Sequence, residues 1–199
     1  MGLKERLENQ ANAITSVAEH DIEQLEQLLD ACEATLRAKN QIVVSALGKN
    51  VPICEKFAGT LNSFGLECRF MHTNSAIHGD LGILKPGDLL IIVSKSGSTE
   101  ESLRLAKEAK RKPITTWAFS CRADSPLTKL TTRTTYVCLT HEGDLWNLTP
   151  INSSMVFLAA FNAIAIELAS RLGCTKDTFL ENHPGGAIGR KGKRIGKPK

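Results

Sequence analysis

Hydroxyl side chains gather in one short segment of the chain, at Ser94, Ser96, Ser98 and Thr99, with Gly97 among them. The apolar run at residues 89–93 predicts a buried strand before this segment, and the apolar spacing over residues 103–109 predicts a helix after it. Backbone N–H groups at a helix start are unpaired and carry partial positive charge, so they bind anions. Because the hydroxyls add further donors, the segment predicts a phosphate-binding turn.

A helix cap is the alternative explanation of this turn. Ser98 or Thr99 could cap the following helix, with Glu101 just beyond it. A cap needs one such residue, whereas this segment holds four hydroxyls within six positions. Neither the nucleotide P-loop pattern G-x-x-x-x-G-K-S/T nor the dinucleotide pattern G-x-G-x-x-G is present. We therefore expect a small phosphorylated ligand rather than a nucleotide.

The overall composition predicts an ordinary globular protein. The chain has 199 residues, of which 42% are hydrophobic and 23% charged, a length that suits one domain with an added arm. No uninterrupted apolar run approaches the roughly 18–20 residues that span a bilayer, and the N-terminus is charged rather than apolar. We therefore expect a cytoplasmic protein without a membrane partner.

Cysteine spacing and charge narrow the classes of ligand. The six cysteines form no C-x-x-C pair, so we expect neither a metal site nor a redox site, and nothing indicates a cofactor. The formal net charge is +4, but six basic residues lie in residues 190–199, so the rest of the chain is net acidic. We expect residues 191–199 to be a disordered basic tail, and no nucleic-acid-binding face.

The remaining pattern alternates strands and helices. Residues 1–38 form a predicted helical arm with a break at His20-Asp21, and residues 39–190 form the predicted domain. Strands are expected at residues 41–47, 67–72, 89–93, 113–119 and 134–139. Helices are expected at residues 51–64, 153–172 and 175–181, and after the phosphate turn. Apolar strands in this alternation predict an open, doubly wound α/β domain with a parallel sheet.

Polar residues follow several of the predicted strands. Lys49 follows the first strand, His78 the second, the phosphate turn the third and Glu142 the fifth. In doubly wound folds, ligands bind beyond the carboxyl ends of the strands. We therefore expect all four groups at the same edge of the sheet.

The order of these motifs resembles the SIS (sugar isomerase) domain family, and especially its arabinose 5-phosphate isomerase branch without the CBS pair. The matching pieces are Gly48-Lys49, the loop His78-Gly79-Asp80-Leu81-Gly82, the turn 94–100, the segment 150–154 and His183-Pro184-Gly185-Gly186-Ala187-Ile188-Gly189. The resemblance implies a five-stranded parallel sheet flanked by helices. It also implies a homo-oligomer, a tetramer or dimer, with sites near subunit interfaces.

The resemblance further implies the chemistry of an aldose–ketose isomerase acting on a sugar phosphate. A proton moves between C1 and C2 through an enediol, and no metal is needed in principle. Glu142 matches a family glutamate and would be the carbon base, while Lys49 would supply positive charge. His78 would line the site, and His183 would open the sugar ring or shuttle protons.

The chain departs from the family at the phosphate turn. The isomerases usually carry Ser-Asn-Ser-Gly-Glu there, but this chain has Lys95 for the asparagine and Ser98 for the glutamate. Asn50 stands where the family favours serine after Gly-Lys. Two alternatives therefore stay open: a non-catalytic phosphosugar-binding module, and an isomerase of other specificity, such as hexulose 6-phosphate isomerase or phosphoheptose isomerase.

Overall fold

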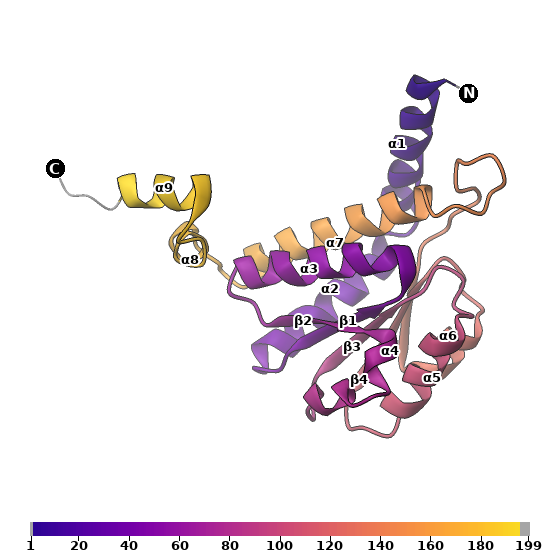
Figure 1. The fold of residues 1–199 in the computed structure, drawn as a ribbon, viewed down its shortest axis with the longest axis horizontal. Coiled ribbons are helices and arrows are strands. Elements are labelled where there is room, and N and C mark those ends of the chain that lie inside the picture. Colours follow the sequence, from indigo (N-terminus) through magenta and orange to yellow (C-terminus); the bar gives the residue numbers. More distant parts are fainter. Residues whose placement is uncertain (1, 196–199) are drawn as a thin grey trace.

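Five parallel strands form a single sheet at the centre of the protein (Figure 1). The computed structural model describes the backbone of residues 2–195 and the side chains of residues 2–190. The strands run in the order β2-β1-β3-β4-β5, and every neighbouring pair is parallel. They are β1 (Ile42–Ala46), β2 (Cys68–His72), β3 (Leu89–Val93), β4 (Thr115–Ser120) and β5 (Arg133–Tyr136). The predicted open α/β sheet is confirmed.

The central strands align so that their carboxyl ends meet at one edge. Every residue of β1 and β3 is buried, as expected for strands covered on both faces. Ala46 at the end of β1 pairs with Val93 at the end of β3, and Val93 pairs with Phe119 of β4. The turns after these strands therefore start side by side.

Four long helices cover one face of the sheet: α1 (Leu3–His20), α2 (Ile22–Arg37), α3 (Val51–Ser63) and α7 (Asn152–Arg171). Stacked phenylalanines join them to the sheet, with Phe161 lying 4.6 Å from Phe57 and 4.8 Å from Phe119 between ring centroids. Helix α1 contacts α7 and α2 contacts β5, so the predicted helical arm packs against its own chain. The predicted break falls at Asp21, between the two helices.

Helix α7 is long and apolar enough to cross a membrane by length and composition alone. Half of its most apolar window is buried inside the protein, against α1, α2 and α3. A core helix covered on several sides has this composition because it presents apolar residues in every direction. The sequence predicted this apolar helix at residues 153–172, and the search for membrane spans, which considered only unbroken apolar runs, did not include it.

Shorter elements cover the other face: α4 (Thr73–Ala76), η2 (Asp80–Ile83), α5 (Glu100–Ala109) and α6 (Pro126–Leu130). The segment 73–82, which we expected to be a loop, thus contains one helical turn and part of a 3-10 turn. Helix α6 was not predicted, although its start carries recognisable signals. Ser125 and Thr128 form a capping box there, and Pro126 occupies the first turn.

Strand β5 ends earlier than predicted, at Tyr136 instead of residue 139. It is an edge strand, and polar groups at the start of α2 occupy its free side. The Gln24 side-chain oxygen accepts from the Tyr136 N–H at 2.9 Å, and an Asp21 carboxylate oxygen accepts from the Cys138 N–H at 2.8 Å. These side chains replace a neighbouring strand, so the segment leaves the sheet there.

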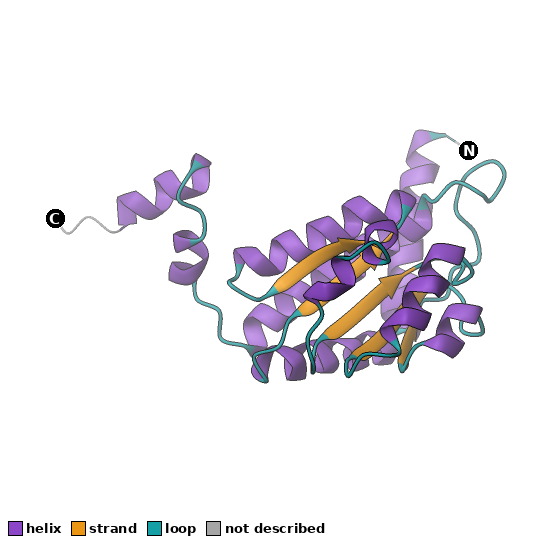
Figure 2. Ribbon diagram, turned by 60° about the horizontal axis from the view of Figure 1, so that its bottom comes forward, coloured by secondary structure: helices purple, strands orange, loops and turns teal. Residues whose placement is uncertain are grey.

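The C-terminal segment leaves the body of the protein as two short helices, α8 (Lys176–Glu181) and α9 (Gly186–Ile195) (Figures 1 and 2). Figure 2 shows them at the end of the sheet opposite the arrowheads of the strands. Phe179 contacts Phe64 at 5.6 Å between ring centroids, and Asn182 donates to the Ser63 carbonyl at 3.3 Å. The backbone of α9 extends to Ile195, into the stretch that we expected to be a basic tail, and residues 196–199 lie outside the described part.

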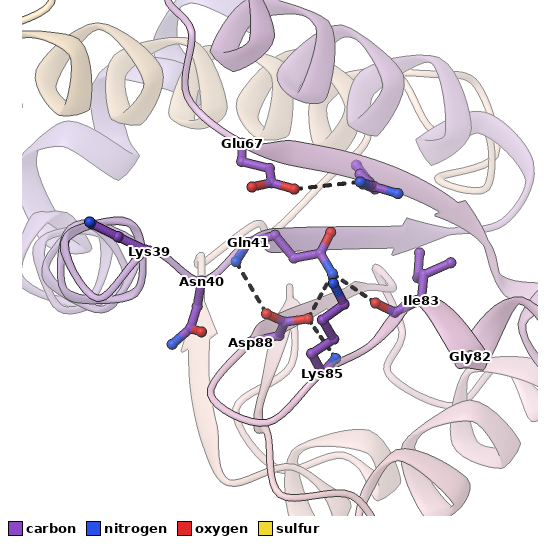
Figure 3. Close-up of a pocket in the computed structure, with 9 residues that line it drawn as sticks. Lys39, Asn40, Gln41, Glu67, Gly82, Ile83, Lys85 and Asp88 are labelled. Carbon is purple, nitrogen blue, oxygen red and sulfur yellow. Dashed lines mark hydrogen bonds and ion pairs between the residues drawn. The ribbon is translucent and has the colours of Figure 1, made fainter.

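A hollow of about 190 Å³ lies at the amino ends of β1 and β3, and a buried carboxylate is among the groups that line it (Figure 3). Asp88, only 2% exposed, accepts from the Gln41 N–H at 3.2 Å, the Gln41 side-chain amide at 2.7 Å and the Lys85 N–H at 2.8 Å. These bonds join the starts of β1 and β3. They therefore stabilise the sheet at the amino ends of its strands. The predicted site residues that follow strands lie at the carboxyl ends instead.

Candidate active site

The predicted phosphate turn is fixed by backbone bonds to β4 and to the segment that follows it. The Ser94 N–H donates to the Phe119 carbonyl at 3.0 Å, and the Lys95 carbonyl accepts from the Cys121 N–H at 3.0 Å. The Gly97 carbonyl accepts from the Leu127 N–H at 2.9 Å. Because three bonds join it to the next segment, the turn is part of the rigid sheet edge.

Gly97 is required at the centre of the turn for two reasons. Its φ of +61° is in the left-handed region that residues with a Cβ rarely adopt. A Cβ at this position would also lie 2.1 Å from Ser125 Oγ and 2.6 Å from Ser125 Cβ. The turn therefore depends on close contact with the start of α6.

The hydroxyls of the turn do not cap the following helix. Thr99 occupies the N-cap position of α5, but its side chain makes no capping hydrogen bond. Its Oγ1 lies 3.2 Å from Ser94 Oγ, and Ser98 Oγ donates to Ser96 Oγ at 3.0 Å. The hydroxyls thus pair with one another, and the first turn of α5 has no side-chain cap. This arrangement favours anion binding over the capping alternative.

A cavity of about 200 Å³ opens beside the turn. Polar and charged residues from two chain segments line it: Lys49, Asn50, Ser94, Lys95, Ser96, Thr99 and Ser102. Ser102 was not predicted, yet its buried Oγ has no hydrogen-bond partner among the described residues. Its position in the first turn of α5 was the available signal. The sheet edge therefore brings Lys49 and the phosphate turn together, as expected.

Glu142 lies at the same edge, but its side chain is fully buried. Oε2 accepts from the Ile151 N–H at 3.0 Å and the Ser153 N–H at 2.9 Å. Oε1 accepts from Ser153 Oγ at 2.6 Å and lies 2.5 Å from the Lys95 ammonium nitrogen. A carboxylate has about four acceptor positions, so these donors occupy all of them.

Opposing effects set the charge of Glu142. Burial by itself raises the pKa of the carboxyl, but hydrogen bonds from Lys95 and Ser153 outweigh it and hold the pKa below its ordinary value. Glu142 is therefore ionised at neutral pH, and it forms an ion pair with Lys95.

The two lysines of the cavity differ in their surroundings. Lys95 has a side chain 36% exposed, lines the cavity and pairs with the buried carboxylate. Lys49 is exposed and makes no ion pair with the described residues. The sequence indicated Lys95 only as extra positive charge, because nothing in its spacing links it to Glu142, forty-seven positions later.

Five predicted site residues do not line this cavity: Gly97, Ser98, Glu142, His78 and His183. His78 is exposed in the loop after α4 and is not among the lining residues. His183 lies after α8, where its Nδ1 contacts the Phe179 carbonyl at 2.6 Å and its ring packs 4.2 Å from the Phe179 ring. Because α8 projects from the other end of the sheet, His183 does not reach the cavity of its own chain (Figure 2).

The described part of the chain holds no group of three or more histidine, cysteine or acidic side chains placed to bind a metal ion.

Cys121 is a thiol near Glu142. Burial raises its pKa to about 12, and the negative charge of Glu142 adds to this effect. Because a neutral thiol is a poor nucleophile, Cys121 is not a candidate for the chemistry of the site.

Sequence relatives identify the family of this site. Residues 35–167 match the SIS domain model. The chain is 36% identical to arabinose 5-phosphate isomerase KdsD of Pseudomonas aeruginosa over 166 residues, which covers 83% of this chain and 51% of that protein. It is 32% identical to the Yersinia pestis protein of the same name, over 89% of this chain and 56% of that protein. The chain thus spans about half the length of these relatives.

Solved structures share the same fold. A putative sugar-phosphate isomerase from Listeria monocytogenes superposes with a TM-score of 0.85 at 28% identity, covering 92% of this chain and 95% of that one. A protein of Escherichia coli CFT073 in complex with arabinose 5-phosphate gives a TM-score of 0.85 at 27% identity over the same shares. With its sheet order, its phosphate turn and these matches, the chain belongs to the SIS domain family.

Proposed function

We propose that this protein is a sugar-phosphate aldose–ketose isomerase that interconverts arabinose 5-phosphate and ribulose 5-phosphate. The observation that carries the proposal is one cavity that combines an uncapped, hydroxyl-rich helix start with Lys95, a lysine that pairs with the buried carboxylate of Glu142 behind it. The first feature suits the phosphate, and the second suits proton transfer at the neighbouring carbons. The names of the relatives and the sugar-phosphate complex of a structural neighbour support this substrate class.

In this proposal the phosphate binds at the turn from Ser94 to Thr99 and at the first N–H groups of α5. Lys49, an exposed lining residue of the cavity, balances the phosphate charge or the enediolate charge. Glu142 removes the proton from C2 of the aldose and returns it to C1, which requires an acceptor position on the carboxylate to become free. The side chains of the protein supply every group that these steps need.

His183 would act in the site of a second copy of the chain. It lies on a segment that projects from the body, and it contacts Phe179 of the same segment rather than the cavity. The loop before α7 also exposes Leu145, Trp146 and Leu148, at 74%, 71% and 76%, which suits a subunit contact. We therefore propose a homo-oligomer, a dimer or tetramer, in which His183 of one copy opens the sugar ring in the site of another.

A non-catalytic phosphosugar-binding module is the second candidate. Ser98 replaces the glutamate that the family isomerases carry, and Glu142 is saturated by donors in this structure. Both observations are compatible with a site that binds the sugar without converting it.

Product formation separates the candidates. The protein would be incubated with ribulose 5-phosphate, a hexulose 6-phosphate and a heptulose 7-phosphate, and phosphorus NMR would follow each mixture. Arabinose 5-phosphate forming from the first alone supports the proposal. Conversion of another sugar would indicate a different isomerase, and a raised melting temperature without conversion would indicate a binding module.

A further inference from the structure

Lys95 and Glu142, the two members of the ion pair, differ sharply in their access to a ligand in the cavity. Lys95 lines the cavity and its side chain is 36% exposed, whereas the Glu142 side chain is fully buried. The Lys95 ammonium lies 2.5 Å from Glu142 Oε1. A sugar phosphate entering the cavity therefore meets Lys95 before it meets the carboxylate.

The other donors to Glu142 are fixed in place. Two are backbone N–H groups, of Ile151 and Ser153, and the third is the hydroxyl of Ser153 at the start of α7. Lys95 differs because four rotatable bonds separate its ammonium from the backbone, and because part of its side chain is exposed. Lys95 is thus the donor that can leave Oε1 without disturbing the backbone.

The backbone of Lys95 keeps its position when the side chain moves. Its carbonyl accepts from the Cys121 N–H at 3.0 Å and from Ser120 Oγ at 3.1 Å. The side chain can therefore change its partner while the phosphate turn stays intact. A sugar hydroxyl or carbonyl oxygen in the cavity provides such a partner.

We propose that Lys95 is a catalytic residue. In the empty site its ammonium blocks Glu142, and when substrate binds the ammonium moves from Glu142 to pair with the sugar's reacting oxygen. This inference rests on the proposed isomerase function. The transfer frees Oε1, which takes the proton from C2 of the aldose and becomes a neutral acid. The C1–C2 double bond forms, and the electron pair of the C1 carbonyl becomes an enediolate oxygen beside the positive ammonium.

The second half of the reaction restores every group. Glu142 returns its proton to C1. The ammonium of Lys95 gives a proton to the C1 oxygen and takes the proton of the C2 hydroxyl, which leaves the C2 carbonyl of the ketose. The ammonium then pairs with the carboxylate again, so protons and charges balance without a co-reactant.

A Lys95→Met variant tests the proposal because it removes the ammonium and keeps most of the side-chain volume. We expect deuterium exchange at C2 of arabinose 5-phosphate to slow by about 100-fold or more, as when one charge-stabilising donor is removed. The loss falls on kcat, and KM and the affinity for inorganic phosphate change only a few-fold. Lys129→Met is the matched control, since Lys129 is also ion-paired, to Asp124 at 2.7 Å, but does not line the cavity.

The pH profile tests the ion pair, whereas the loss of kcat at a nearly unchanged KM is the readout that a merely structural lysine would not give. Lys95 helps to hold the pKa of Glu142 low, so Lys95→Met moves the acid limb of kcat/KM to higher pH. Cys121, the thiol near the pair, has a pKa of about 12 and does not titrate in that range. Arg122 is a further charged group near this thiol.

Lys95→Arg and the double variant Lys95→Met/Glu142→Gln guard against simple unfolding. The arginine keeps the ion pair and should retain at least tenfold more exchange than methionine, although it cannot shuttle the proton. The double variant has no unpaired buried charge, and it should be folded but no more active than either single variant.

The outcomes separate this inference from the proposed function. Full exchange by Lys95→Met would overturn the role of Lys95 while leaving the isomerase intact. A wild-type protein that exchanges no sugar would overturn the isomerase. In that case binding of a hydroxamate analogue of the five-carbon sugar phosphate, which imitates the enediolate, tests the role of Lys95. Equal affinity of wild type and Lys95→Met would overturn the contact between the ammonium and the reacting oxygen. Binding at least tenfold weaker in the variant would support it.

Discussion

Two regions were predicted to belong to one site, but only the first is assembled within the chain. The first, which we call the corner, consists of the phosphate turn and Glu142. The second is the segment that carries His183. The turn is bonded to the segment after β4 through Ser94, Lys95 and Gly97, and Lys95 pairs with Glu142 beyond β5. His183 instead contacts the helix immediately before it. A parallel sheet brings together the loops that leave its strands, but it places no such constraint on a segment that leaves the last helix.

The largest effect on folding should come from Gly97→Ala, which strains the assembled corner. A left-handed φ costs a residue with a Cβ roughly 1–2 kcal/mol, and the contact with Ser125 adds a similar amount, so we expect a loss of about 2–4 kcal/mol of unfolding free energy. Urea denaturation measures it. Gly185→Ala, in the projecting segment, is the control because its Cβ would meet no atom within 4 Å. Equal effects of the two changes would contradict the difference between the regions.

Ser96→Ala should weaken binding at the corner rather than folding. Ser96 lines the cavity, so its loss removes a donor to a charged ligand at a cost of roughly 1.5–3 kcal/mol in binding. Calorimetric titration with arabinose 5-phosphate should show affinity reduced about 10- to 150-fold. Ser63→Ala, at the far end of α3, serves as the control, and unchanged affinity at Ser96 would refute the phosphate site.

Acid should destabilise the corner through Glu142. Its pKa is lower in the folded protein than in the unfolded chain, so its contribution to stability is present above the ordinary carboxyl pKa of about 4.3 and is lost as the pH falls through the folded value. The wild type should therefore lose more unfolding free energy than Glu142→Gln as the pH is lowered from about 6 to 3. Parallel losses in the two proteins would mean that the carboxylate is not held ionised.

The smallest effect on stability belongs to His183→Ala. Its ring packs on Phe179 of the same short segment, so the unfolding free energy should change by less than about 1 kcal/mol. Exchange activity should nevertheless fall, and mixing this variant with Glu142→Gln should restore part of it, since some sites would then combine an intact Glu142 with a partner's intact histidine. No recovery on mixing would argue against a shared site.

The sequence sufficed for the elements that apolar patterns define. Buried strands such as β1 and β3 are continuous apolar runs, and the parallel sheet followed from their alternation with helices. The turn between β3 and α5 was predictable because its residues are contiguous, and its role in phosphate binding stays a prediction. The end of β5 was not, since Asp21 and Gln24 on a distant helix decide where it stops.

The site was predictable where the sheet dictates position and not where long-range pairing does. Lys49 and the turn meet because both come directly after central strands. The ion pair of Lys95 with Glu142, the unpartnered Ser102 hydroxyl and the separation of His183 depend on side-chain packing and on the path of α8, which single-sequence patterns do not encode.

Proton exchange in deuterium oxide tests the central claim most directly. Wild-type protein would be incubated with arabinose 5-phosphate, and proton NMR would follow the C2 hydrogen. We predict that its signal disappears while ribulose 5-phosphate carrying deuterium at C1 accumulates. An unchanged spectrum with arabinose 5-phosphate and with ribulose 5-phosphate, at protein concentrations that bind the sugar, would contradict the assignment of isomerase chemistry to this cavity.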